Sequence, residues 1–194
     1  PKIDSLLVKS IGAAVKNSTV ALPVALDAEN VQMAWNALRE AKFPRLQVPA
    51  PVSAVQMEYL ANKKPAAMVK AVEETIRACA ACTSEVEFIA DDATRSDPAF
   101  LYEILGRAIA AGAGIVTVCD TAGTMLPDEF GAFVNSLYEN VPGLRDVTLG
   151  VSCSNELALA DACAVAAIRA GAQEIKTAAY CLNTVNLENL AKLL

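Results

Sequence analysis

The chain has 194 residues, of which 54% are hydrophobic, and it carries a formal net charge of −6 without a single histidine. This is enough apolar material for one hydrophobic core, so we expect one domain over residues 1–194. The acidic charge argues against nucleic acid as a partner, and without a signal segment or an apolar run of roughly 18 residues we expect a cytoplasmic protein that does not enter membranes.

Short β-branched runs alternate with helical patterns along the whole chain, which is typical of parallel βα units. Strands are predicted at Thr19–Leu26, Arg45–Pro49, Val86–Ala90, Ile115–Cys119, Val147–Val151 and Glu174–Ala178. Helices are predicted at Lys2–Lys16, Ala28–Ala41, Pro65–Ala81, Ala99–Ala111, Pro127–Asn140 and Leu157–Ala170. The stretch 49–53 interrupts the pattern, because its two prolines lack amide donors.

Six cysteines in an alanine-rich chain are best explained as reduced, small core residues. Cys79 and Cys82 have the spacing of a redox or metal pair, but no second pair follows. Cys119, Cys153 and Cys181 fall near successive strand ends, where they could act as soft ligands or as a nucleophile. Packing explains them better.

Four stretches carry a resemblance to a known family. Residues 87–97 (EFIADDATRSD) are similar to its strand and loop Glu-Phe-Ser-x-Glu-Asp-Ala-x-Arg-Thr-Asp, and residues 119–127 (CDTAGTMLP) to its Asp-Thr-Val-Gly-x-x-x-Pro turn. Residues 56–59 (QMEY) stand where the family has His-Met-Glu-Tyr, and residues 151–156 (VSCSNE) where it has His-x-His-Asn-Asp. The chain resembles the 2-isopropylmalate, homocitrate and citramalate synthases, which have HMG-CoA-lyase-like TIM barrels.

The resemblance implies an incomplete (β/α)8 barrel with about six parallel βα units, equivalent to strands 3–8 of the family barrel. Six strands leave open edges beside residues 19–26 and beyond residues 174–178. Either the strands rearrange, or another chain supplies the missing part, or the protein associates with itself. Because relatives are commonly dimers, we expect a homo-oligomer or a full-length family partner. The family's downstream regulatory domain is expected to be absent.

In the family, a divalent metal polarises a 2-oxo acid that condenses with acetyl-CoA. Its ligands are an Asp on the first strand, two His on the seventh and an Asn near the eighth. By the resemblance, the His pair becomes Ser152 and Ser154, the candidate Asn is Asn183, and Gln47 replaces a further His. Neutral hydroxyls are poor metal ligands. We therefore expect a degraded metal site, with neither metal nor acetyl-CoA bound.

The family's eighth-strand signature, Gly-x-Gly-Glu-Arg-Ala-Gly-Asn, is replaced by residues 179–184 (AYCLNT). Glycines let a backbone approach a ligand closely. Aromatic and aliphatic side chains are expected to fill that space instead.

Some polar groups of the resemblance persist at strand ends, where barrel sites lie. Asp91 replaces a Glu that faces substrate in relatives and is the candidate catalytic residue. Asp92, Arg95, Asp120 and Thr121 are the candidate substrate-binding residues, and Thr121 matches a residue that contacts the oxo-acid carboxylate. The alternative for Asp92, Arg95 and Asp120 is an ion-pair and capping network that holds the loops.

Three functions remain open from the sequence. The first is a homologue with a degraded metal site that is impaired alone and acts through assembly. The second is an acyl-CoA-dependent synthase or lyase that is active when another chain completes the barrel. The third is a metal-free lyase in which Lys176 forms a Schiff base, although an outward-pointing or edge position is the favoured interpretation of Lys176.

Overall fold

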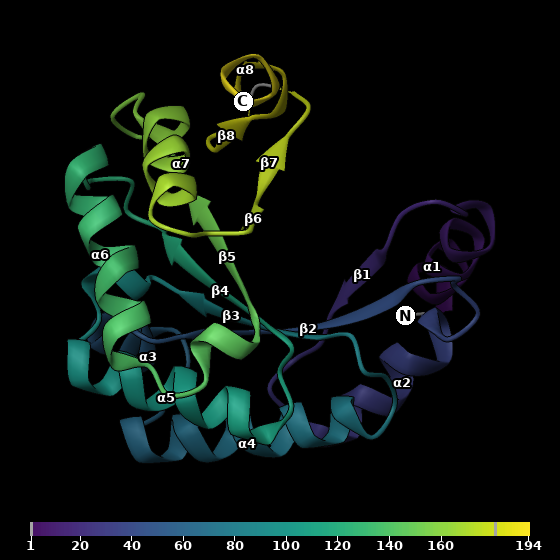
Figure 1. Ribbon diagram of the computed structural model, residues 1–194. Coiled ribbons are helices and arrows are strands. Elements are labelled where there is room, and N and C mark those ends of the chain that lie inside the picture. The colour runs from purple at the N-terminus through teal and green to yellow at the C-terminus, as the bar shows by residue number, and fades with distance from the viewer. Residues whose placement is uncertain (1, 181) are drawn as a thin grey trace.

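The computed structural model describes residues 2–180 and 182–194. Six parallel strands in this part of the chain form one sheet, with neighbours in sequence order. They are β1 (Val20–Pro23), β2 (Pro44–Pro51), β3 (Val86–Asp91), β4 (Ile115–Asp120), β5 (Thr148–Cys153) and β6 (Glu174–Ile175). The sheet curls into a half-barrel (Figure 1), which confirms the expected incomplete TIM barrel.

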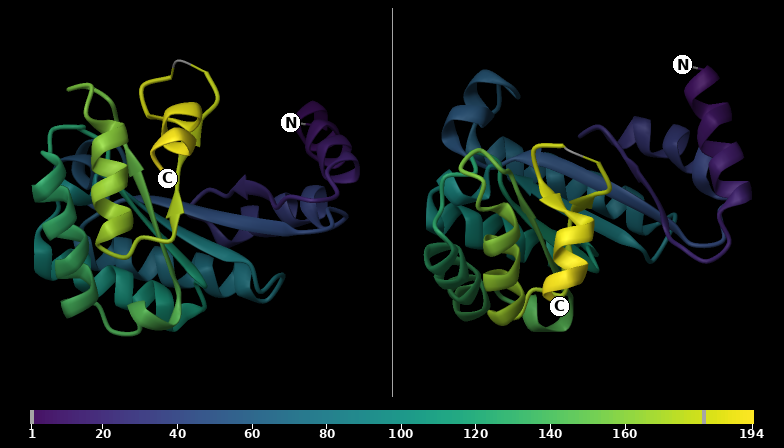
Figure 2. Two further views of the ribbon diagram at one scale, coloured as in Figure 1. Left: turned by 45° about the horizontal axis from the view of Figure 1, so that its top comes forward. Right: turned by 90° about the horizontal axis from the view of Figure 1, so that it is seen from above.

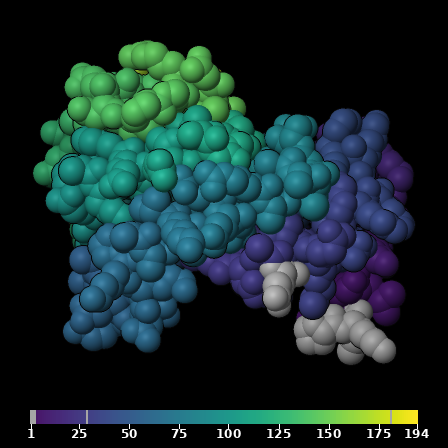
Figure 3. Space-filling view, turned by 90° about the horizontal axis from the view of Figure 1, so that it is seen from below, coloured from purple at the N-terminus to yellow at the C-terminus, as the bar shows by residue number. Residues whose placement is uncertain are grey.

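The helices cover the convex side of this sheet, as expected for right-handed βα units. They are α1 (Lys2–Ala14), α2 (Ala28–Leu38), α4 (Pro65–Ala80), α5 (Pro98–Ala111), α6 (Pro127–Asn140) and α7 (Ala160–Arg169). Seen from below, α4 and α5 lie in teal between the purple N-terminal part and the green α6 (Figure 3). Proline at the first positions of α4, α5 and α6 and left-handed Gly112 after α5 mark the helix ends.

The C-terminal part differs from the sequence prediction. The last predicted strand divides into β6 and β7 (Thr177–Ala178), and β7 pairs in parallel with β8 (Val185–Asn186) outside the main sheet. Two short helices, α3 (Ala54–Tyr59) and α8 (Leu187–Leu193), lie outside the six predicted helix ranges, although a helix was expected at the C-terminal end. Helices of six and seven residues show too little periodicity to be recognised from sequence.

The proline-rich stretch does not end β2, contrary to the prediction, because the strand continues to Pro51. The backbone amide of Val52 donates to the carbonyl of Asp91 on β3. Amides of successive residues point to opposite sides of a strand, so Pro49 and Pro51 lack an amide on the side that faces β1. On that side β1 pairs only as far as Gln47. Proline is tolerated there, since no ladder bond is lost.

Successive side chains of each strand point to opposite faces of the sheet, so that one face is mainly apolar and the other carries polar side chains. In β3, Val86 and Phe88 are buried in the core, whereas Glu87 and Asp91 lie on the concave face. The inside of the half-barrel therefore carries polar side chains that are positioned by a well-packed apolar layer.

Both edges of the sheet stay open within the described residues, because β1 pairs only with β2 and β6 only with β5. The strands keep barrel order, so they have not rearranged. Figure 2 shows α1 and α8 on opposite sides of the opening. None of the described helices is long and apolar enough to cross a bilayer.

Candidate functional site

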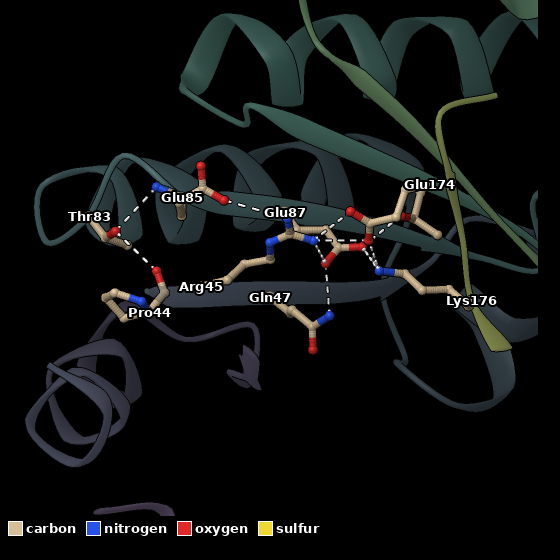
Figure 4. Close-up of polar contacts among 9 residues, drawn as sticks. Pro44, Arg45, Gln47, Thr83, Glu85, Glu87, Glu174 and Lys176 are labelled. Carbon is tan, nitrogen blue, oxygen red and sulfur yellow. Dashed lines mark hydrogen bonds and ion pairs between the residues drawn. The ribbon is translucent and has the colours of Figure 1, made fainter. Parts of the chain in front are cut away.

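A buried carboxylate lies at the centre of the concave face (Figure 4). The side chain of Glu87 is fully buried and accepts hydrogen bonds from Thr117 Oγ1 at 2.6 Å and Gln47 Nε2 at 2.8 Å. Lys176 Nζ lies 2.6 Å from Glu87 Oε1, and Arg45 Nη1 lies 3.6 Å from Glu87 Oε2. Two cations and two neutral donors thus compensate the buried charge.

An ion pair between distant strands closes the curl. Arg45 on β2 donates from Nη1 to both carboxylate oxygens of Glu174 on β6, at 2.8 and 2.9 Å. In a flat sheet these strands would be roughly 19 Å apart, so their side chains meet only because the sheet is curved. Burial alone would raise the pKa of Glu174, but hydrogen bonds from Lys176 and Arg45 lower it below its usual value.

A row of polar side chains crosses the concave face nearer the strand ends. The strand register pairs Cys119 with Ser152. One step beyond the β3–β4 and β5–β6 pairings, it aligns Asp91 with Cys119 and Ser152 with Lys176. Asp91 and Ser152 are the polar neighbours of the Cys119 thiol in this row. Burial, together with Asp91, raises the pKa of this thiol, and burial raises the pKa of Asp91. Cys119 is therefore a protonated thiol and a poor nucleophile.

A second network holds the loops at the strand ends. Asp92 is buried with a left-handed backbone (φ 61°), and its carboxylate accepts two 2.7 Å hydrogen bonds from Arg95 and one of 2.5 Å from Ser53 Oγ. Its backbone amide donates to Thr121 Oγ1 at 2.9 Å. Asp120, which is also buried, accepts from Thr94 Oγ1 at 2.7 Å. These contacts are those of an ion-pair and capping network.

The positions that correspond to metal ligands do not fit a divalent metal. Ser152 and Ser154 offer neutral hydroxyls, and Ser154 forms a β-bridge with Thr184. Asn183 accepts from the Asn155 amide at 3.1 Å and donates to Glu156, so its side chain is already engaged. In the described part of the chain no three His, Cys, Asp or Glu side chains are grouped to hold a metal ion.

The space left by the lost glycine signature is not filled as expected. The side chains of Tyr180 and Leu182 are 83% and 66% exposed. Thr184 instead reaches the end of β5, where its hydroxyl donates to the Cys153 carbonyl at 3.1 Å, and the neighbouring large residues turn outward. Cys181 lies outside the described residues.

Lys176 was expected to point outward or to lie at an edge; the edge position is confirmed, because Lys176 directly follows the edge strand β6, but the outward direction was wrong. Lys176 follows β6 directly and shares the inward side of Glu174, two residues earlier, so that Nζ contacts both Glu87 and Glu174. Arg45, Glu87 and Glu174 were not predicted as site residues from the sequence. The available signal was charge at alternate positions of otherwise apolar strands, which marks an inward polar face.

Comparisons with known proteins agree with this architecture. The sequence profile of the HMGL-like family matches residues 3–182. A 2-isopropylmalate synthase of Pelotomaculum thermopropionicum is 35% identical over 175 residues, covering 90% of this chain and 35% of that protein. The chain thus spans about a third of the length of the curated relatives that it matches.

Solved structures show the same fold at low identity. An HMG-CoA lyase from Pseudomonas aeruginosa superposes with a TM-score of 0.76 at 15% identity, covering 96% of this chain and 66% of that chain. An HMG-CoA lyase from Acenitobacter baumannii, in complex with coenzyme A and 3-methylmalate, gives 0.72 at 13% identity, covering 95% and 64%. With its half-barrel and its profile match over nearly the whole sequence, the chain belongs to the HMGL-like family.

Proposed function

We propose that residues 1–194 form one partial barrel domain related to the 2-isopropylmalate and homocitrate synthases, in which the inherited metal site no longer works unaided. The domain is impaired in the condensation of acetyl-CoA with a 2-oxo acid when it is alone, and it acts through assembly. The observation that carries this proposal is the donor set at Ser152, Ser154 and Asn183, which consists of two hydroxyls and an amide engaged by Asn155 and Glu156.

The retained polar residues take distinct roles in this proposal. Asp91 is the candidate acid or base, since it lies on the concave face with a carboxyl pKa raised by burial. Asp92, Arg95 and Asp120 act on substrate mainly through the loops that they hold, because their polar atoms already bind one another and their neighbours. Thr121 is exposed and is the candidate contact for a substrate carboxylate.

The open edges support assembly. Unpaired strand edges favour pairing with further chain, and β1 and β6 are both free on one side in the described structure. The proposed cover is a second copy of the chain or a full-length relative, and the proposed compartment is the cytoplasm.

An assay of free CoA release tests this directly. The purified chain is incubated with acetyl-CoA, a panel of 2-oxo acids and Mg²⁺, Mn²⁺ or Zn²⁺. We expect no release above the rate without protein. Metal-dependent release by the chain alone would overturn the proposal.

The second candidate is an acyl-CoA-dependent synthase or lyase that becomes active when another chain completes the barrel. It is favoured by polar side chains at the strand ends, where Thr121 matches the family residue and Asp91 provides a carboxylate in place of the family Glu. It requires CoA release by the purified complex. A defined complex that stays inactive with every oxo acid excludes it.

A Schiff-base lyase is less well supported. Lys176 Nζ is engaged in ion pairs with two carboxylates, whereas Schiff-base formation needs an amine that is free to attack a carbonyl carbon.

A further inference from the structure

The ammonium group of Lys176 is fixed in position on the concave face. Nζ lies 2.6 Å from Glu87 Oε1 and 2.5 Å from Glu174 Oε1 (Figure 4). Glu87 is itself held by Thr117 and Gln47, so the ammonium has a rigid support. A charged donor that is already oriented loses little freedom when it binds a ligand.

Lys176 keeps one donor for a ligand. A lysine ammonium has three N–H groups, and the described structure gives Nζ two acceptors, one on Glu87 and one on Glu174. The side chain is 28% exposed, so it can be reached from the concave side.

The neighbours of Lys176 form a small polar site. Lys176, Ser152, Cys119 and Asp91 follow one another along the row described above, each on its own strand or directly after it. Burial and Asp91 raise the pKa of the Cys119 thiol, whereas the positive charge of Lys176 lowers it. A ligand seated on this row would meet a cationic donor at one end, a hydroxyl beside it and a carboxyl group at the other end.

We propose that Lys176 is a ligand-binding cation of this chain, and that its free N–H donates to an oxygen of a small 2-oxo acid lying along the row from Ser152 to Asp91. This rests on the proposed function for the choice of ligand and deepens it. A charge-assisted hydrogen bond from a fixed ammonium orients and polarises a carbonyl oxygen. The binding is non-covalent.

The local charges limit which ligands fit. Three carboxylates, Glu85, Glu87 and Glu174, face two cations, Arg45 and Lys176, so the network carries no excess positive charge. Such a site favours a single polarised oxygen or one negative charge over several. We therefore expect pyruvate to bind at this position and inorganic phosphate not to compete with it there.

Titration with pyruvate tests the proposal, with binding followed by protein-observed NMR in the absence of any acyl-CoA. We expect saturable binding by the wild-type chain and at least tenfold weaker binding by Lys176→Met. Lys70→Met is the matched control, because Lys70 is a surface lysine paired with Glu74 on α4. Its affinity should stay within twofold of wild type.

A double variant keeps the test decisive if Lys176→Met does not fold. Lys176→Met leaves the buried Glu87 without its closest cation, so Lys176→Met/Glu87→Gln removes both charges and should restore folding without restoring binding. Wild-type chain that does not bind pyruvate, or a folded Lys176 variant that binds with unchanged affinity, would overturn the proposal.

Two further outcomes separate the hypotheses. A borohydride-stable adduct at Lys176 would replace hydrogen bonding with Schiff-base formation and so reject the non-covalent site. Catalytic inactivity of the chain does not bear on the proposed Lys176 site, because binding is measured without acyl-CoA. Conversely, metal-dependent condensation would reject the proposed function while leaving the Lys176 site intact.

Discussion

The buried carboxylate Glu87 organises the inside of the half-barrel at the scale of single residues. Its contacts come from β2, β4 and the residue after β6, so one side chain connects segments far apart in the sequence. Removing one member of such a buried network costs more than removing an exposed ion pair, because the remaining charges lose their compensation.

Glu174 makes the network sensitive to acid. Its pKa is lowered in the folded protein, so its stabilising effect is complete above the pKa of the unfolded chain, about 4.3, and is lost as the pH falls below that value. Glu174→Gln should lower the free energy of unfolding by about 1–3 kcal/mol at pH 7. Urea unfolding at pH 7 and at pH 3 measures the difference.

The difference in the free energy of unfolding between wild type and Glu174→Gln should be markedly smaller at pH 3 than at pH 7. Glu188→Gln is the control, because Glu188 pairs with Lys192 on the surface of α8 and should cost less than about 1 kcal/mol. Equal effects of the two substitutions at pH 7 would contradict the structural account of the network.

Asp91 should respond to pH in the opposite sense. Burial raises its pKa, so the charged form costs free energy in the folded protein. This cost is absent below the unfolded pKa, about 3.9, and appears as the pH rises through the folded pKa. Asp91→Asn should therefore be more stable than wild type at pH 7, with the advantage shrinking toward pH 4 in thermal unfolding. A less stable variant at pH 7 would contradict this.

The sequence predicted which residues gather at the strand ends but not the direction of Lys176. Motif resemblance placed Asp91, Asp92, Arg95 and Asp120, because a strand fixes where its last residues lie. The inward turn of Lys176 depends on where β6 stops and β7 begins. A strand two residues long carries too little pattern to set that boundary.

At the scale of elements, two glycines make room for the site. A Cβ atom on Gly150 of β5 would collide with the Thr117 hydroxyl that donates to Glu87. Gly123, after β4, has φ +62°, and a Cβ atom there would lie 2.7 Å from the Ser154 carbonyl oxygen. Glycine at 123 thus lets the turn after β4 pack closely against the end of β5.

Gly123→Ala should destabilise the protein by about 1–3 kcal/mol, through backbone strain and the contact with Ser154. Gly114→Ala is the matched control, because its nearest neighbour, the Ser84 carbonyl oxygen, would be 3.8 Å away. Chemical denaturation of both variants measures the difference. If Gly123→Ala were no less stable than Gly114→Ala, the turn would not have the conformation described.

The elements themselves could largely be predicted from the sequence. Long apolar strands and alanine-rich helices have a clear period; the first five predicted strands and the six predicted helices are present, whereas the sixth strand is divided between β6 and β7. Pro49 and Pro51 were wrongly expected to end the strand. Proline is excluded from a strand only where a neighbouring strand needs its amide as a donor, and here β1 ends before it reaches these prolines. Where a neighbouring strand ends is a property of the tertiary structure and cannot be read from the local sequence.

At the scale of the described structure as a whole, the main feature is a half-barrel whose sheet does not close. Helices cover the convex side of the sheet, whereas both sheet edges remain unpaired in the described structure. Leucine and isoleucine side chains on the two helices beside the opening are also exposed: Leu6, Leu7 and Ile11 on α1, and Leu187 and Leu193 on α8. Exposed apolar groups and unpaired strands together favour association.

The most direct test is the mass of the purified 20.3 kDa chain in solution, with metal content determined on the same sample. We expect a defined assembly larger than one chain, without stoichiometric divalent metal. A stable 20.3 kDa monomer would contradict the role of the open edges, and one bound divalent metal per chain would contradict the degraded site at Ser152 and Ser154.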